Sequence, residues 1–96
     1  MKELEQDLLK KVKNSDKNAF HQLFSNFYDT LFRFVVYKIK DSDLADDISQ
    51  ETFLRVWKRR ASLVPQKFFF SLIALTSTNL CYDHFRHFAI RKRHED

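Results

Sequence analysis

The sequence of 96 residues contains no glycine and a single proline, Pro65. Glycine and proline supply the backbone conformations of most tight turns, so a chain almost without them is expected to form helices joined by short connections. A chain without glycine also cannot build a glycine-rich phosphate-binding loop. These absences predict an all-α fold and exclude the common nucleotide-binding motifs.

Thiols and long apolar runs are scarce as well. Cys81 is the single cysteine, so no internal disulfide can form, as expected for a protein of the reducing cytoplasm. No apolar run approaches the roughly 20 residues of a membrane span, and the N-terminus lacks the apolar stretch of a signal peptide. We therefore expect a cytoplasmic protein that does not contact a membrane.

No arrangement of residues predicts catalysis or a bound cofactor. Ser, His and Asp residues occur, but nothing in their spacing orders them as a catalytic triad. His84 and His87 lie near Asp83 and Cys81, yet a metal site needs three or four convergent ligands and the sequence offers no second ligand cluster. We expect a protein that is not an enzyme and holds neither metal nor cofactor.

Charge is distributed unevenly along the chain, whose formal net charge is +4. Residues 1–54 hold 8 basic and 10 acidic side chains, whereas residues 55–94 hold 9 basic side chains and one acidic. Residues 41–51 carry five acids and no base. The C-terminal part is expected to attract polyanions and the acidic stretch a basic surface, although solubility alone would also account for either charge.

Apolar periodicity predicts a short N-terminal helix followed by a long core helix. In residues 3–13, Leu4, Leu8 and Val12 recur at every fourth position. Asp16 is the expected N-cap of the next helix, over residues 17–39. Its broad apolar face follows the i, i+3, i+4 rule and comprises Phe20, Leu23, Phe24, Phe27, Leu31, Phe34, Val35 and Ile39.

Residues 41–60 predict a third helix with clear ends. Asp43 or Ser42 is the expected N-cap, with Asp46 and Asp47 in the first turn and residues 58–60 in the last. The stripe expected to be buried comprises Ala45, Ile48, Thr52 and Val56. The opposite stripe comprises Asp47, Gln50, Glu51, Leu54 and Lys58. Between the two stripes lie Phe53 and Trp57. This pattern is typical of a solvated surface helix. However, an apolar Leu54 among polar residues also indicates a docking surface.

A loop around Pro65, residues 61–67, and a last helix over residues 66–90 complete the prediction. One side of that helix comprises Phe69, Phe70, Ile73, Ser77, Leu80, Cys81 and Phe88, and the other comprises Phe68, Leu72, Leu75, Asn79, Tyr82, Asp83 and Arg86. The second side mixes rings with polar groups and suits a single-stranded nucleic acid. Alternatively, the helix is buried on both sides and Asp83 and Arg86 form a simple ion pair. The basic tail is expected to fray.

Two motifs resemble a known family. The stretch DLADDISQETFLRVWKR is similar to the core-polymerase-binding helix of the extracytoplasmic-function sigma factors, and NLCYDHFR has the family's N-x-x-x-D-x-x-R pattern. The matching positions are Ala45, Asp47, Gln50, Glu51, Phe53, Leu54 and Trp57, then Asn79, Asp83 and Arg86. The resemblance covers roughly residues 17–90, the family's first helical domain, called region 2. The promoter-reading second domain, region 4, has no counterpart in this sequence.

The resemblance implies a transcription initiation factor domain. Such a domain binds the clamp helices of the largest subunit of core RNA polymerase and captures the single-stranded non-template strand of the −10 promoter element. The implied polymerase-binding residues are Asp47, Gln50, Glu51, Phe53, Leu54 and Trp57. The implied DNA-binding residues are Ser62, Lys67, Asn79, Tyr82, Asp83, Arg86, Arg91 and Arg93. The family's matching loop helps to hold a flipped base, and an anti-sigma factor or a separate region 4 protein is a further implied partner.

The sequence also departs from the family. Leu72 stands where the family usually has Trp, and Thr76-Ser77-Thr78 stand where it usually has Ile-Ala-Arg. These departures weaken the implied DNA contact more than the polymerase contact. Two alternatives therefore stay open: a sigma-like regulator that occupies polymerase without recognising promoters, and a helical protein-interaction module. In each case we expect one domain over 1–96, with an N-terminal helix and link at 1–16, a core at 17–90 and a charged tail at 91–96.

Overall fold

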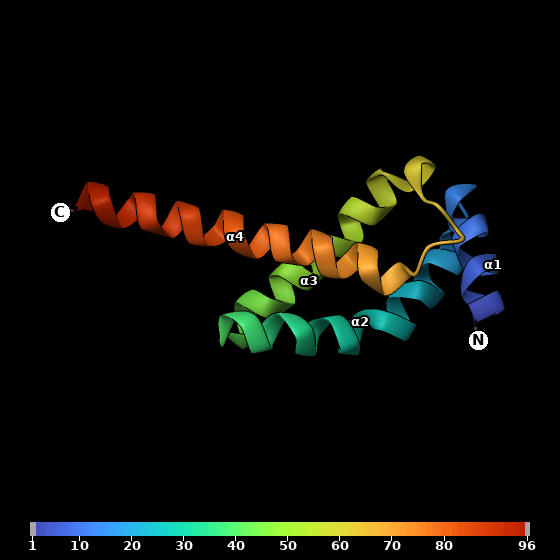
Figure 1. Ribbon diagram of the computed structural model, residues 1–96, viewed down its shortest axis with the longest axis horizontal. Coiled ribbons are helices and arrows are strands. Elements are labelled where there is room, and N and C mark those ends of the chain that lie inside the picture. The colour runs from blue at the N-terminus through green and yellow to red at the C-terminus, as the bar shows by residue number, and fades with distance from the viewer. Residues whose placement is uncertain (1, 96) are drawn as a thin grey trace.

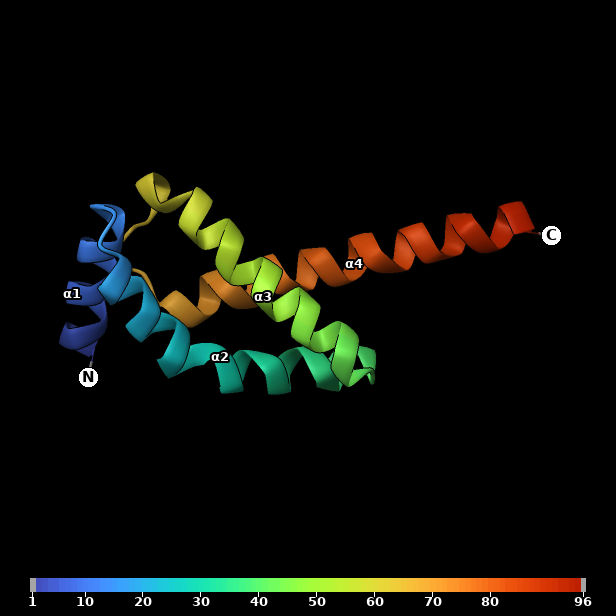
Figure 2. The same ribbon diagram turned by 180° about the vertical axis from the view of Figure 1, so that it is seen from behind.

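The computed structural model describes residues 2–95, and no strand occurs among them. The elements are α1 (Lys2–Lys13), α2 (Lys17–Ile39), α3 (Ser42–Lys58), a short 3₁₀ turn η1 (Arg60–Ser62) and α4 (Phe69–Glu95). Figures 1 and 2 show α1 at one end of the molecule and the C-terminal part of α4 projecting from the other. The prediction of an all-α bundle, with one short and three long helices, is confirmed.

The main core helix, α2, has the predicted bounds because both of its ends are fixed locally. Asp16 Oδ1 accepts a hydrogen bond from the N–H of Ala19 at 3.0 Å, as predicted for the N-cap. At the other end, Lys40 adopts a left-handed conformation with φ of 57°, and its N–H donates to Val36 O at 2.8 Å. Ser15 takes a similar conformation in the turn before α2. Each such residue costs roughly 1–3 kcal/mol without glycine, so the packed helices must hold both turns in place.

The N-cap of α3 is Asp41, so the prediction of Asp43 or Ser42 is wrong. Asp41 is extended, with φ of −140°, and its Oδ1 accepts a hydrogen bond from the N–H of Leu44 at 3.1 Å. The left-handed Lys40 reverses the chain immediately before this residue, which leaves Asp41 as the first residue able to cap the new helix.

The earlier start shifts the charges along α3. Asp43 lies in the first turn, so Asp46 and Asp47 follow later, which corrects the predicted position. The helix ends at Lys58 rather than at Arg60. Arg60 instead lies in η1, where its guanidinium donates to the carbonyl of Trp57 at 2.9 Å and closes the helix end.

The core lies where α2 packs against the other three helices and α3 packs against α4. The stripe of α3 that was predicted to be buried is buried in full. Phe53 joins this core with only 2% of its surface exposed, and its ring packs against Phe24 and Phe69. Burying a large apolar side chain stabilises a fold by about 1.5–3 kcal/mol, so these contacts fix α3 between α2 and α4.

The last helix, α4, begins at Phe69 and continues to Glu95, both later than predicted. The loop around Pro65 delays its start. The basic tail continues α4, and the sequence there contains no glycine or proline to end a helix. Since this part extends beyond α2 and α3, Phe88 is 54% exposed although it shares a side of the helix with the buried Phe69 and Ile73.

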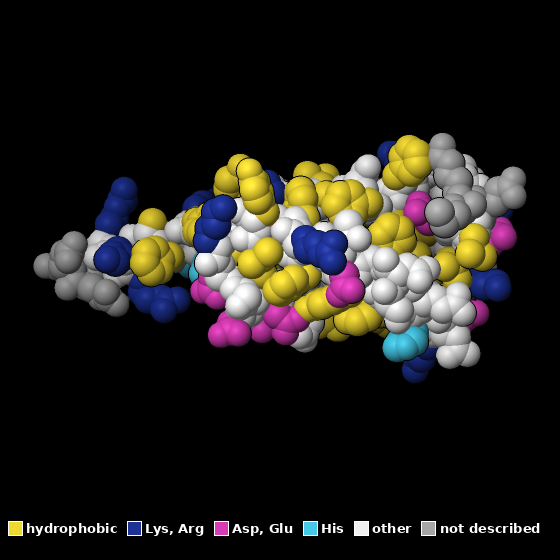
Figure 3. All heavy atoms as spheres, turned by 90° about the horizontal axis from the view of Figure 1, so that it is seen from below, with side chains coloured by type: hydrophobic (Ala, Val, Ile, Leu, Met, Phe, Trp, Pro, Cys, Tyr) yellow, Lys and Arg dark blue, Asp and Glu magenta, His cyan; other side chains and the backbone are white. Residues whose placement is uncertain are grey.

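Charged side chains are unevenly distributed over the face of the molecule that Figure 3 shows. Figure 3 shows Lys and Arg side chains along the projecting end of α4 and a group of Asp and Glu side chains over the neighbouring part of the bundle. Among the described residues, no helix has both the length and the apolar character needed to cross a membrane.

Candidate functional site

The outer face of α3 presents four of the predicted polymerase contacts. Asp47, Gln50 and Leu54 are exposed, and Glu51 is half-buried. Leu54, an apolar side chain, has 51% of its surface in solvent. Gln50 Nε2 donates to Asp46 Oδ2 at 2.9 Å, which holds that amide in the acidic face. The face therefore combines carboxylates, an amide and one apolar side chain, the composition expected of a protein-docking surface.

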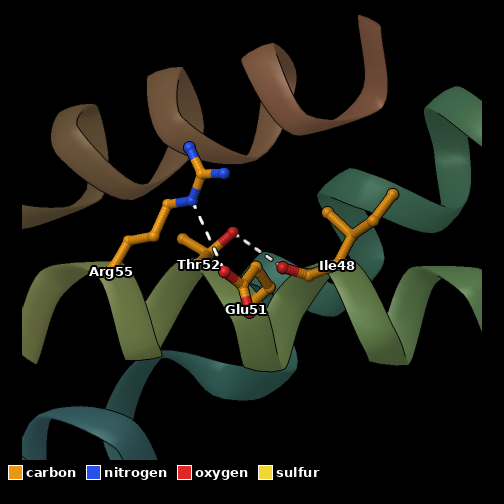
Figure 4. A network of polar contacts seen from close by, with 4 residues as sticks. All are labelled: Ile48, Glu51, Thr52 and Arg55. Atoms are coloured by element: carbon orange, nitrogen blue, oxygen red, sulfur yellow. Dashed lines mark hydrogen bonds and ion pairs between the residues drawn. The ribbon is translucent and has the colours of Figure 1, made fainter. Parts of the chain in front are cut away.

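The turn of α3 that holds Glu51 and Thr52 has one side on this face and the other side in the core. Glu51 forms an ion pair with Arg55 at 3.5 Å, while Thr52 Oγ1 donates to Ile48 O at 2.8 Å on the buried side (Figure 4). Thr52 thus satisfies its hydroxyl inside the helix, and Glu51 keeps its carboxylate on the outer surface.

The other two predicted polymerase contacts, Phe53 and Trp57, lie elsewhere. Phe53 belongs to the core, and Trp57 is half-buried between the ring of Phe20 at 5.1 Å and the guanidinium of Arg60 at 4.3 Å. A helical projection places both residues between the buried and the exposed stripe of α3. It does not tell which border between these stripes another helix covers. We therefore treat both as residues that position α3.

A groove between α2 and α3 extends the outer face. It has a volume of about 410 Å³ and is lined by Phe20, Phe24, Tyr28, Asp46, Gln50, Phe53 and Leu54. Its lining combines aromatic rings with two polar side chains, a mixture found at protein interfaces. Sequence reasoning assigned the α2 rings to the core alone. Their partial exposure follows from the breadth of the apolar face of α2, which α3 does not fully cover.

A cavity of about 290 Å³ lies where α3, the following loop and α4 meet. Its lining combines apolar side chains with three cations and two hydroxyls: Leu9, Val56, Leu63, Val64, Phe68, Phe69 and Leu72, then Arg55, Arg59, Lys67, Ser62 and Thr76. Ser62 and Lys67, two predicted DNA contacts, are brought together here. Apolar side chains are the groups on which a flat base stacks, and cations are the groups that neutralise a phosphate, so the lining has the chemistry that binding an unpaired nucleotide requires.

Sequence reasoning missed Arg55 and Arg59 as cavity residues. The available signal was their spacing of four, which places them on one face of a helix. Only the packing of α4 reveals that this face borders the loop. Thr76 was noted as a departure from the family pattern, and it too lines the cavity.

The second side of α4 is exposed, so the alternative in which α4 is buried on both sides is wrong. Tyr82 is 63% exposed, Asn79 and Arg86 are exposed, and Asp83 is half-buried. The ion pair of that alternative is present, since Arg86 donates to Asp83 Oδ1. Arg91 and Arg93 lie farther along the same helix, on the part that projects beyond the bundle.

The one thiol of the chain lies in the core. Burial raises the pKa of Cys81, and the nearby charge of Lys38 offsets part of that effect. The thiol is therefore protonated at neutral pH and is a poor nucleophile or metal ligand. Within residues 2–95, no three His, Cys, Asp or Glu side chains gather in a way that could hold a metal ion.

Comparisons with known proteins identify the family. The family described as Sigma-70 region 2 matches residues 23–89. The ECF RNA polymerase sigma factor BldN of Streptomyces coelicolor is 28% identical over 81 residues, which cover 83% of this chain and 31% of that relative. The chain thus corresponds to about a third of that relative's length, and no solved structure matches it. Because the family match covers more than half of the chain and agrees with the resemblance to extracytoplasmic-function sigma factors, this protein belongs to the Sigma-70 region 2 family.

Proposed function

We propose that this chain is the promoter-opening and polymerase-binding part of a sigma factor that acts in transcription initiation. The outer face of α3 binds the clamp helices of core RNA polymerase, and the cavity with the exposed side of α4 captures the unpaired non-template strand of the −10 element. The observation that carries the proposal is the cavity, whose lining combines apolar side chains with three cations, one of them, Arg55, ion-paired with Glu51.

The energies of base capture support this role. Taking a base out of the duplex costs a few kcal/mol. Stacking one base on an aromatic side chain returns about 1–3 kcal/mol, and Phe68 lines the cavity while Tyr82 lies farther along α4. Stacking therefore offsets a large part of the cost of each captured base, and phosphate contacts with the cavity cations add to it. No reaction is needed, because binding the single strand removes it from the duplex equilibrium.

Polymerase binding is assigned to α3 because its outer face differs from the DNA-facing cavity in charge. Residues 41–51 carry five acids and no base, which suits a basic surface and repels phosphate. Leu54 and the apolar groove beside it supply the contact area that charges alone lack. The two partners can then bind at the same time on different faces of α3.

The test of the proposal is single-strand binding by a cavity variant. Arg59→Gln combined with Lys67→Gln removes two of the three cavity cations without removing buried apolar groups. In complex with core polymerase, we expect the affinity for a fluorescein-labelled single strand of random sequence to fall at least about tenfold, since each lost phosphate contact weakens binding strongly. Fluorescence anisotropy measures this affinity.

The control variant removes two cations from exposed positions that do not line the cavity, Lys10→Gln with Lys17→Gln. It should bind the single strand nearly as well as the parent. A parent that binds polymerase but no single-stranded DNA would favour the polymerase-occupying regulator instead. Equal DNA affinity in the cavity variant and the control would remove the cavity from the DNA site.

A further inference from the structure

The segment that connects α3 to α4 is held in place by α1 and the turn that follows it. This segment, residues 60–69, forms one wall of the cavity. Three long-range hydrogen bonds tie it down: Phe69 N–H to Glu5 Oε2 at 3.0 Å, Lys13 Nζ to Leu63 O at 3.0 Å, and Arg60 Nε to Ser15 Oγ at 2.8 Å. They join residues that are 64, 50 and 45 positions apart in the sequence. The N-terminal helix and the turn after it thus contact the start, middle and end of the segment.

Glu5 supplies the capping acceptor at the N-terminus of α4. The first N–H groups of a helix have no partner within it and are normally satisfied by a Ser, Thr, Asp or Asn at the N-cap. The residue before α4 is Phe68, whose side chain contains no acceptor atom. The carboxylate of Glu5 supplies the acceptor from α1, and its negative charge also complements the positive end of the α4 dipole.

Lys13 and Leu9 of α1 hold the middle of the same segment. Lys13 donates to the carbonyl of Leu63, whose side chain is buried in the core. Leu9 of α1 itself lines the cavity together with Leu63. In Figure 1 the chain between η1 and α4 runs to α1 and returns, so α1 lies against the segment whose shape defines the cavity.

We propose that α1 is a positioning element for the cavity, with Glu5 and Lys13 as the side chains that set the conformation of residues 60–69. The proposed function is assumed only for the nature of the ligand, a single-stranded nucleic acid. Helix α1 precedes residues 23–89, which the family matches, so the family match assigns it no role. Its contribution is indirect, because neither Glu5 nor Lys13 lines the cavity.

The test compares two double variants of α1. Glu5→Ala with Lys13→Met removes the two contacts, whereas Asp7→Ala with Lys10→Met removes the same charges from exposed positions of the same helix. Hydrogen exchange followed by mass spectrometry reports directly on residues 60–69. We expect exchange there to become about tenfold faster in the first variant only, with exchange in α2 unchanged, since charged hydrogen bonds are worth about that factor.

Single-strand affinity in complex with core polymerase gives the second readout, with the random-sequence single strand as probe. We expect the first variant to bind about tenfold more weakly at unchanged affinity for polymerase, and the control to bind as the parent does. Glu5→Gln alone keeps an acceptor oxygen and is expected to retain most of the affinity. This rescue would not occur if the glutamate acted only through its charge.

The outcomes separate this proposal from the proposed function. Unchanged exchange of residues 60–69 in the first variant, or faster exchange with parental DNA affinity, overturns the role of α1. A parent that binds no single strand contradicts the proposed function, and the exchange measurement then decides alone whether α1 sets the conformation of the segment.

Discussion

Ser49 is buried without any exposed surface, and its Oγ has no hydrogen-bond partner among the described residues. The two other buried hydroxyls are satisfied, Thr52 by Ile48 O and Ser77 by Ala74 O. An unsatisfied buried polar group costs about 1–3 kcal/mol. The small volume of serine, rather than its hydroxyl, is therefore what the packing of α3 requires at this position.

We expect Ser49→Ala to raise the free energy of unfolding by about 1 kcal/mol, because it removes an unpaired hydroxyl and keeps the volume nearly unchanged. Urea denaturation followed by circular dichroism measures the change. Ser77→Ala is the matched control, since its hydroxyl donates to a carbonyl at 3.1 Å, and it should not stabilise. Similar loss of stability in both variants would mean that Ser49 has a hydrogen-bond partner.

Single residues also show where sequence prediction succeeds. Asp16 could be predicted as a cap because it directly precedes residues 17–39, whose apolar pattern is clear. Residues 41–43 offer three acceptors in a row, and only the left-handed Lys40 selects Asp41. Glu5 could not be predicted as a cap of α4, because a contact across 64 positions leaves no periodic signal in one sequence.

At the scale of the helix, the projecting part of α4 has no packing partner among the described residues. Phe85, Phe88 and Ile90 are exposed there, next to Arg91, Lys92 and Arg93. Removing cations from this part should cost little stability, since no buried contact depends on them. Their effect should appear in the salt dependence of DNA binding instead.

We expect Arg91→Gln with Arg93→Gln to make the slope of log affinity against log salt shallower by about 1.4, because two fewer phosphates of a single strand are neutralised. The melting temperature should not change. Anisotropy titrations of the polymerase-bound chain at several salt concentrations measure the slope. Lys17→Gln with Arg33→Gln removes the same charge from exposed positions of α2. An equal change in that control would point to net charge rather than to contact by α4.

Whole helices, like single caps, could be predicted only where their bounds depend on residues that are close in the sequence. The bounds of α2 followed from its periodicity and its local caps. The end of α4 did not, because the charged residues 91–95 show no apolar periodicity that would mark them as helix. Likewise, Ser62 and Lys67 were predicted as DNA contacts only through the family resemblance, whereas the place of Arg55 and Arg59 at the same cavity required knowledge of where α4 packs.

For the whole molecule, the separation of charge assigns the two proposed partners to different surfaces. The acidic outer face belongs to the first turns of α3, and the cations of the cavity come from its last turn and the following loop. A helix can carry both because its two ends lie on different sides of the crossing with α4. Variants of one surface should therefore leave the other partner's binding intact.

Asp47→Ala with Gln50→Ala tests this separation. Both side chains are exposed, so the variant should fold normally. We expect its affinity for core polymerase to fall at least about tenfold, as for residues near the centre of an interface, while its affinity for the single strand stays the same. Sedimentation of the labelled chain with core polymerase gives the first value and anisotropy the second.

The matched control, Gln22→Ala with Asp29→Ala, removes the same groups from exposed positions of α2. If it weakens polymerase binding as much as the α3 variant does, polymerase senses the overall negative charge of the N-terminal half and not a defined face. If only the α3 variant is impaired, the acidic face and its groove are the docking surface. The polymerase-binding face and the proposed nucleotide cavity are then separate sites on α3, and the core around Phe53 supports both.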